Sequence, residues 1–215
     1  MIHVIVADDQ ALIRGALSAL IDLEDDMRVV AQAADGREVI AAVEAYNAEN
    51  SSGDQAAKAA STLVVIMDVE MPVMDGISAA AALKDRVANA RVLMVTTFGR
   101  PGYVQRALDA GAVGFIVKDA PAEQLLEAIR RTSQGLRTVD PALAVDALTK
   151  GQSPLSAREV EVLRAFESGG TVEDVASELM LSAGTVRNYV SSAMDKTHAH
   201  TRAEALKVAT ENGWL

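Results

Sequence analysis

The sequence contains no cysteine, which excludes disulfides, thiolate metal sites and cysteine nucleophiles. Aromatic residues make up only 3% of the 215 residues while half are hydrophobic, so the interior must be built from aliphatic side chains. An aliphatic interior suits a parallel sheet covered by helices. No apolar run approaches the ~18 residues that a membrane-spanning helix needs. We therefore expect a cytoplasmic protein with no membrane insertion.

Positive charge is also scarce in this chain. Twenty Lys and Arg residues oppose thirty Asp and Glu residues, which gives a net charge of −10. Such an excess of negative charge argues against indiscriminate binding to nucleic acid or to anionic lipid. The length allows one or two domains with ample material for a core.

The most informative stretch is residues 63–76, in which an apolar run ends abruptly in a carboxylate. Residues 63–67 are apolar and mostly β-branched, and Asp68 follows them directly before a loop that contains Pro72 and Gly76. This pattern predicts a buried strand that stops at a functional loop. In an open parallel sheet, ligands bind at the carboxyl ends of the strands. The alternative is that Asp68 only caps the next helix, although Asp75 is already placed to do so.

Strand and helix patterns alternate through the first 130 residues. A doubly wound parallel sheet with right-handed crossovers follows from five strands that alternate with five helices. The apolar strand patterns cover residues 2–7, 27–33, 63–67, 91–96 and 113–117. Residues 47–62 are small and polar, and we interpret them as a surface insertion or a fraying helix extension.

The pattern changes after residue 131. We interpret residues 132–153 as a linker, in which a short helix is expected to begin at Asp140-Pro141. Residues 154–215 are helical in period throughout, with four helices expected over residues 156–168, 171–180, 182–196 and 201–212. Ser182 or Thr185 can cap the third of these helices. Two short helices joined by a tight turn in a small all-α domain indicate a helix-turn-helix.

The strand ends place a set of polar groups on one rim of the sheet. Three carboxylates that converge would repel one another without a cation, and an all-oxygen cluster suits Mg²⁺. With the metal bound, a carboxylate at this rim could attack phosphorus and form an aspartyl phosphate, while a lysine and a hydroxyl balance charge on the phosphoryl oxygens. The residues concerned are Asp8, Asp9, Asp68, Thr96 and Lys118.

Residues 1–131 resemble the flavodoxin-like receiver domain of two-component response regulators. Five positions carry the resemblance: Asp8-Asp9 as the acidic pair, Asp68 as the phosphoacceptor, Met71-Pro72-x-x-Asp75-Gly76 as the loop after it, Thr96 as the switch hydroxyl and Lys118 at the end of the run 111–118. The resemblance implies that Asp9, Asp68 and the backbone carbonyl of Glu70 bind Mg²⁺, with Asp8 assisting through water. It also implies that Phe115 is the aromatic switch residue.

Residues 154–215 resemble the LuxR-type output domain of the NarL/FixJ family. The motif is Leu155-Ser-x-Arg-Glu-Val-Glu-Val-Leu163 followed by Val175-Ala-x-x-Leu-x-Leu-Ser-x-x-Thr-Val-Arg-Asn-Tyr-Val190. The resemblance makes the third helix the recognition helix, which enters the major groove of DNA. Arg187 suits guanine or phosphate and Asn188 suits adenine, while phosphate contacts are expected from Thr185, Ser191 and Lys196. Each of these five has a plain alternative as a solvated surface residue.

The two resemblances together imply a transcription factor switched by phosphorylation. A histidine kinase would phosphorylate Asp68, the Thr96 hydroxyl would move toward the phosphate, and Phe115 would follow into the space that Thr96 leaves. The changed surface would favour a homodimer that binds an operator of two half-sites one helical turn (~34 Å) apart. The last helix would supply the dimer contact, pack on its own domain, or do both, through Ala205, Leu206 and Ala209.

Other interpretations remain open from sequence alone. An aspartyl-phosphate phosphatase or phosphotransferase would also need an acidic pocket, but no cap elements are evident and the helical C-terminal part would be unexplained. An orphan regulator that ignores phosphate is a third interpretation, disfavoured by the intact acidic set. His198 and His200 form either a metal pair or, without a third ligand, two surface residues, and Thr197-His198 departs from the usual Leu-Gly of the family.

Overall fold

The computed structural model describes residues 1–51, 62–86, 90–97, 101–139 and 153–215. Its contacts divide the chain into two compact units, made mainly of residues 1–144 and residues 145–215. The elements between residues 1 and 139 are β1 (Ile2–Ala7), α1 (Ala11–Asp22), β2 (Met27–Ala33), α2 (Gly36–Ser51), β3 (Thr62–Met67), α4 (Gly76–Arg86), β4 (Ala90–Thr96), α5 (Pro101–Asp109), β5 (Gly114–Val117), α6 (Ala122–Ser133) and β6 (Thr138–Val139).

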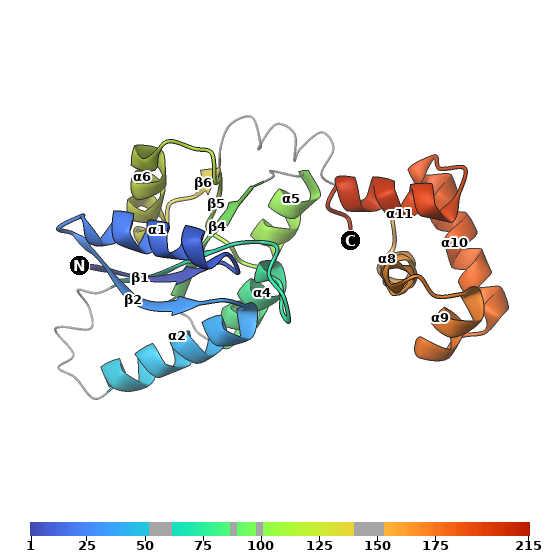
Figure 1. The fold of residues 1–215 in the computed structure, drawn as a ribbon, viewed down its shortest axis with the longest axis horizontal. Coiled ribbons are helices and arrows are strands. Elements are labelled where there is room, and N and C mark those ends of the chain that lie inside the picture. Colours follow the sequence, from blue (N-terminus) through green and yellow to red (C-terminus); the bar gives the residue numbers. More distant parts are fainter. Residues whose placement is uncertain (52–61, 87–89, 98–100, 140–152) are drawn as a thin grey trace. The chain divides into compact units, whose positions relative to one another are not determined.

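The strands form one parallel sheet in the order β2-β1-β3-β4-β5-β6. Figure 1 shows α1 and α6 on one face of this sheet and α2 and α4 on the other. The core between the sheet and α1 and α6 is aliphatic, with side chains from β1, β3, β4 and β5 packed against Ile21 and the apolar face of α6. The predicted doubly wound parallel sheet is therefore confirmed.

The register of the sheet decides which residues meet at its carboxyl rim. Ala7 of β1 lies opposite Met67 of β3, so Asp8 and Asp68 leave the sheet at the same level. The backbone amide of Asp68 donates to the carbonyl of Ala7 at 2.9 Å, which continues the pairing by one residue. Thr96 lies opposite Val117 in the pairing of β4 with β5, so Lys118 follows at the neighbouring position.

The sheet has one more strand than the sequence predicts. β6 pairs with β5 in parallel and lies within the predicted linker. Gly135, at φ 78°, lets the chain reverse after α6, so that the amide of Thr138 reaches the carbonyl of Val113 at 3.3 Å. Residues 140–152, including the short helix predicted at Asp140, lie outside the described residues, and so do residues 52–61 of the predicted insertion. Residues 47–51 continue α2.

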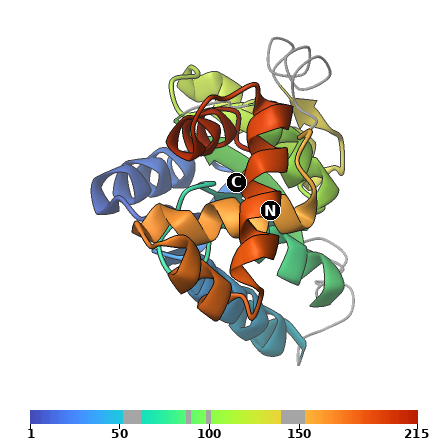
Figure 2. The same cartoon turned by 90° about the vertical axis from the view of Figure 1, so that its right-hand side faces the viewer.

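The second unit is all helical and confirms the predicted four-helix domain. Its elements are α8 (Ala157–Ala165), a 3₁₀ turn (Phe166–Ser168), α9 (Val172–Glu178), α10 (Ala183–Thr197) and α11 (Arg202–Glu211). Each of the four α-helices begins after a Ser or Thr whose hydroxyl accepts a backbone N–H of the first turn, which satisfies a group that would otherwise lack a partner. Figure 2 shows α10 crossing α8.

Two small apolar clusters hold this unit together. One joins α8, α10 and α11, and the other joins α8, α9 and the start of α10. Ala205 and Ala209 are fully buried in the first cluster, and Leu206 packs against it. This face of α11 therefore packs on its own domain, which was one of the two predicted roles. No helix in the described ranges is both long and apolar enough to span a bilayer.

Candidate functional site

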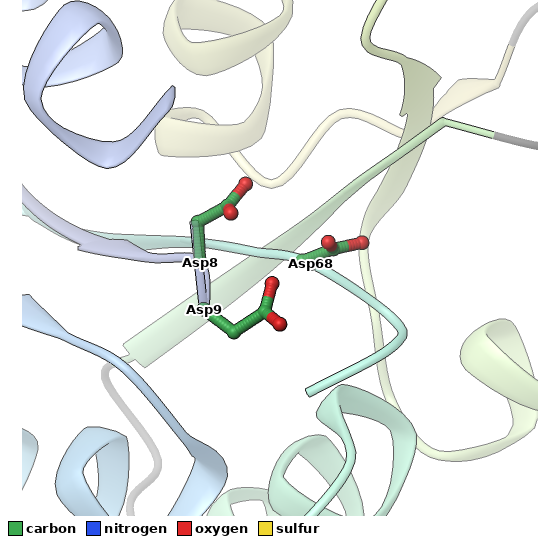
Figure 3. A group of neighbouring side chains, drawn as sticks. All are labelled: Asp8, Asp9 and Asp68. Carbon is green, nitrogen blue, oxygen red and sulfur yellow. The ribbon is translucent and has the colours of Figure 1, made fainter. Parts of the chain in front are cut away.

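Three carboxylates gather where β1 and β3 end. Asp8 and Asp9 follow β1 and Asp68 follows β3, and one oxygen of each lies within 4.8 Å of the others (Figure 3). Asp8 and Asp68 are buried, at 1% and 5% exposure, whereas Asp9 is exposed. The predicted acidic cluster therefore forms, with one of its members open to solvent.

Lys118 lies between the two buried carboxylates. Its Nζ is 2.6 Å from Oδ2 of Asp8 and 2.7 Å from Oδ2 of Asp68. Burial raises the pKa of the Asp68 carboxyl, opposed by the hydrogen bond and charge of Lys118. Burial alone would lower the pKa of Lys118, but its bonds to the two carboxylates outweigh that effect and raise the pKa. Lys118 is thus the charged partner that allows two buried acids to lie side by side.

The loop after β3 brings the start of α4 against the backbone of Asp68. A Cβ on Gly76 would overlap the carbonyl oxygen of Asp68, so only glycine lets α4 begin so close to the site. Asp75 caps α4, because its Oδ1 accepts the amide of Ser78 at 2.7 Å. Since Asp75 fills this role, the capping alternative for Asp68 falls away. Glu70 is exposed in the same loop, and its carbonyl as a metal ligand stays a prediction.

Asp8 is oriented by its own neighbours along the chain. Its Oδ1 accepts the amide of Gln10 at 2.8 Å, and its backbone carbonyl accepts Nη1 of Arg14 at 2.5 Å. Arg14 was not predictable from the sequence, because an arginine six residues after Asp8 carries no recognisable spacing signal. Arg14 fixes the turn between β1 and α1 and so contributes to the shape of the site.

The all-oxygen donor set fits a hard divalent cation. The three carboxylate oxygens lie within 4.8 Å of one another, and Mg²⁺ prefers oxygen ligands of this kind. Asp8, Asp9 and Asp68 would hold such an ion. Among the described residues they are the one group with the spacing of a metal site, so His198 and His200 belong to none.

The two predicted switch residues lie on neighbouring strands. Thr96 is the last residue of β4 and is 3% exposed, and Phe115 lies opposite Met94 in β5 and is fully buried. Because Ile116 packs into the core under α6, alternation along the strand turns Phe115 to the other face of the sheet. Thr96 lies at the carboxyl rim of the sheet beside Lys118, whereas Phe115 lies in the interior of the domain.

The helix-turn-helix presents an exposed row on α10. Arg187, Asn188 and Ser191 are exposed, and Arg187 Nη2 lies 2.9 Å from Oε1 of Glu173 on α9. Ser182 rather than Thr185 is the cap of α10, and the Thr185 hydroxyl lies 2.8 Å from that of Ser182. Contacts of these residues with DNA stay a prediction.

Lys196 has a protein partner. Its Nζ contacts both oxygens of the buried Glu159, at 2.9 and 2.7 Å. The sequence predicts a phosphate contact at Lys196. For Glu159 it predicts only membership of the family motif of residues 155–163. The Ser156-x-x-Glu159 capping box was a visible signal for the first contacts of Glu159, but not for its partner on α10.

The turn after α10 contains Thr197-His198, the pair that departs from the usual Leu-Gly of the family. His198 takes a left-handed conformation, at φ 54°, where glycine would be relaxed. Thr197 is buried and its hydroxyl donates to the carbonyl of Ala193 at 2.8 Å. The exposed imidazole of His198 therefore marks a helix end, and the amide of His200 donates to Glu204 at 2.7 Å.

Comparison with known proteins identifies both units. Residues 4–130 match the model of the response regulator receiver domain, and residues 153–209 match that of the luxR family of bacterial regulatory proteins. The chain belongs to the response regulators with a LuxR-type output domain. It is a DNA-binding transcriptional response regulator of a two-component system, and this family consists of regulators rather than catalytic enzymes. The phosphatase interpretation is therefore dropped.

Individual relatives match over their whole length. The uncharacterized transcriptional regulatory protein YvfU of Bacillus subtilis (strain 168) is 40% identical over 215 residues, covering all of both chains. The transcriptional regulatory protein DesR of the same organism is 38% identical with the same coverage. The crystal structure of the response regulator ChrA, from a heme-sensing two-component system, is 30% identical, with a TM-score of 0.53 over 99% of this chain and 98% of ChrA.

Proposed function

We propose that Asp68 accepts a phosphoryl group from a histidine kinase in the cytoplasm. A carboxylate oxygen of Asp68 attacks phosphorus, a P–O bond forms, and the P–N bond to the kinase histidine breaks. The single observation that supports this most is the buried Asp68 carboxylate, held 2.7 Å from Lys118 beside two further acids. A buried acid with a fixed cation is what an in-line transfer needs to stabilise developing charge.

Mg²⁺ is the cation that the site would use. Asp8, Asp9, Asp68 and the backbone carbonyl of Glu70 would hold it, with Asp8 acting through water. When bound, Mg²⁺ supplies positive charge to the phosphoryl oxygens. Lys118 supplies a second positive charge, and it can turn from Asp68 toward the phosphoryl group once the Asp68 oxygen is esterified.

The switch would then use Thr96 and Phe115. Phosphate on Asp68 offers acceptor oxygens to the Thr96 hydroxyl, and Phe115 fills the space behind it. To change the active fraction from 1% to 99%, the phosphate must favour the active form by roughly 5.5 kcal/mol. A homodimer is the proposed output, with a surface other than the Ala205 and Ala209 face of α11, because both side chains are already buried in their own domain.

We infer that α10 is the helix that recognises DNA. Arg187 and Asn188 would read base edges, while Thr185 and Ser191 would contact phosphates. The dimer would bind two half-sites one helical turn apart, since residues 154–215 carry six Lys and Arg against nine Asp and Glu and a single copy has little phosphate affinity.

Sedimentation of the full chain with Mg²⁺, with and without beryllofluoride, tests this proposal. Beryllofluoride mimics the aspartyl phosphate, so we expect a shift from monomer to dimer that requires both Mg²⁺ and Asp68. Asp68→Ala should show no shift. A dimer that forms without beryllofluoride, or in Asp68→Ala, would contradict gating by phosphate and would favour an orphan regulator whose DNA binding is equal under both conditions.

A further inference from the structure

Glu159 is a buried charged residue of the second unit, and its carboxylate accepts several hydrogen bonds. The residue is 3% exposed, and its side chain lies between α8 and α10. Oε2 accepts the backbone amide of Ser156 at 2.6 Å, and Oε1 accepts the hydroxyl of Ser192 at 2.6 Å. Lys196 Nζ donates to both oxygens, at 2.9 and 2.7 Å. One carboxylate thus ties the start of α8 to two residues of the recognition helix.

The contacts keep this carboxylate ionised despite its burial. Burial would raise the pKa of Glu159, but hydrogen bonds from Lys196, Ser192 and Ser156 outweigh it and lower the pKa to about 2. A buried charge that is paired and hydrogen-bonded in this way is costly to disturb, because removing one partner leaves the other uncompensated.

The bonded residues flank the buried stripe of α10. Ser192 and Lys196 are one helical turn apart, beside the buried Val186 and Ala193. Arg187 lies on the exposed side of the same helix. A shift of α10 along or about its axis would therefore break the Glu159 contacts and move the exposed row at the same time.

We propose that Glu159 is a positioning residue of the DNA interface, which fixes α10 against α8 through Ser192 and Lys196. Lys196 is then an anchor of the recognition helix and not a phosphate contact. The inference rests on the proposed role of α10 in DNA binding. The competing possibility is that Lys196 contacts phosphate and that Glu159 merely weakens it as a nearby negative charge.

The two possibilities predict opposite signs for Glu159→Gln. If charge alone matters, removing an acid frees Lys196 and tightens DNA binding. If Glu159 positions α10, the loss of the ion pair weakens binding by about tenfold even though the domain becomes more positive. Glu161→Gln is the matched control, because Glu161 lies two residues along α8 and pairs with Arg158 at the surface at 2.6 Å. It should leave affinity unchanged or slightly tighter.

The measurement is the affinity of the full chain, activated with Mg²⁺ and beryllofluoride, for a duplex that the unsubstituted chain selects from random-sequence DNA. A salt series separates the roles of Lys196. Loss of a phosphate contact reduces the slope of log K against log salt by about 0.9, whereas loss of an anchor leaves the slope unchanged. We expect Lys196→Gln to weaken binding with no change in slope, and the double variant Glu159→Gln/Lys196→Gln to bind no worse than either single variant.

Trp214 reports whether the variants fold. It is the sole tryptophan and packs against the α8, α10 and α11 cluster, so its fluorescence follows this unit within the full chain. Should Glu159→Gln fail to fold, Ser192→Ala removes a single bond to Glu159 and should weaken binding by about threefold.

Two outcomes would overturn the proposal. One is tighter binding by Glu159→Gln together with a reduced salt slope for Lys196→Gln, and the other is equal affinities for Glu159→Gln and Glu161→Gln. Arg187→Ala separates this failure from that of the proposed function: if it too leaves affinity unchanged, α10 is not the recognition helix.

Discussion

At the scale of single residues, the receiver site depends on how two buried acids share one lysine. Asp8 and Asp68 follow neighbouring strands and both contact Lys118. The strand-end positions of all three were predictable, because apolar runs that end in polar groups mark the carboxyl rim of a parallel sheet. Their pairing distances were not, since these depend on the register of three strands and on the turn that Arg14 holds.

Replacing Lys118 by methionine should lower the stability of the receiver at neutral pH without Mg²⁺. The change leaves Asp8 and Asp68 buried without a cation, and the expected loss in the free energy of unfolding is about 3 kcal/mol. Burial and the charge of Asp8 both raise the pKa of Asp68, and without Lys118 little opposes them. An acid whose folded pKa is raised gains stability on protonation, so the loss should shrink as pH falls from 7 toward 5.

Denaturant unfolding at several pH values, followed by circular dichroism, measures this effect. Lys118→Met/Asp68→Asn is the control, because it removes one of the two charges and should recover part of the stability at pH 7. A loss that is equal at pH 5 and pH 7 would show that Lys118 acts through packing of its methylene stem and not through charge.

At the scale of elements, the long periodic segments were predictable from the sequence, whereas the short strand β6 was not. The five strands and the four C-terminal helices have clear apolar periods. β6 has two residues, Thr138 and Val139, which carry no period, and it forms because Gly135 reverses the chain beside an open strand edge. The role of Glu159 was missed for a related reason, since Ser192 and Lys196 are more than thirty residues away along the chain.

Substitution by alanine should raise the free energy of unfolding at one glycine and lower it at another. Gly15 lies inside α1 with no neighbouring atom near an added Cβ, so Gly15→Ala should raise the free energy of unfolding by about 0.5–1 kcal/mol. Gly76 begins α4 against the Asp68 carbonyl, so Gly76→Ala should displace α4 and cost about 3 kcal/mol. Denaturant titration of both variants measures the difference. A neutral Gly76→Ala would mean that α4 moves away from Asp68 at little cost.

At the scale of the whole molecule, charge limits what one copy can do on DNA. The chain carries a net charge of −10, and residues 154–215 contribute three of those negative charges. Phosphate contacts supply a large share of the affinity of DNA-binding proteins. In the proposed dimer, two linked recognition helices would add their contacts on one duplex and so offset the acidic charge of each output domain.

Half-site spacing should therefore control binding by the activated protein. A selected duplex with two half-sites places both copies of α10 on one side of the DNA, and inserting five base pairs rotates one half-site by about half a turn. We expect this insertion to abolish cooperative binding in the presence of Mg²⁺ and beryllofluoride, and an insertion of ten base pairs to restore it in part. Gel-shift titration measures the cooperativity. Equal binding to all three duplexes would show that each recognition helix acts alone, and phosphorylation would then have to act within a single chain.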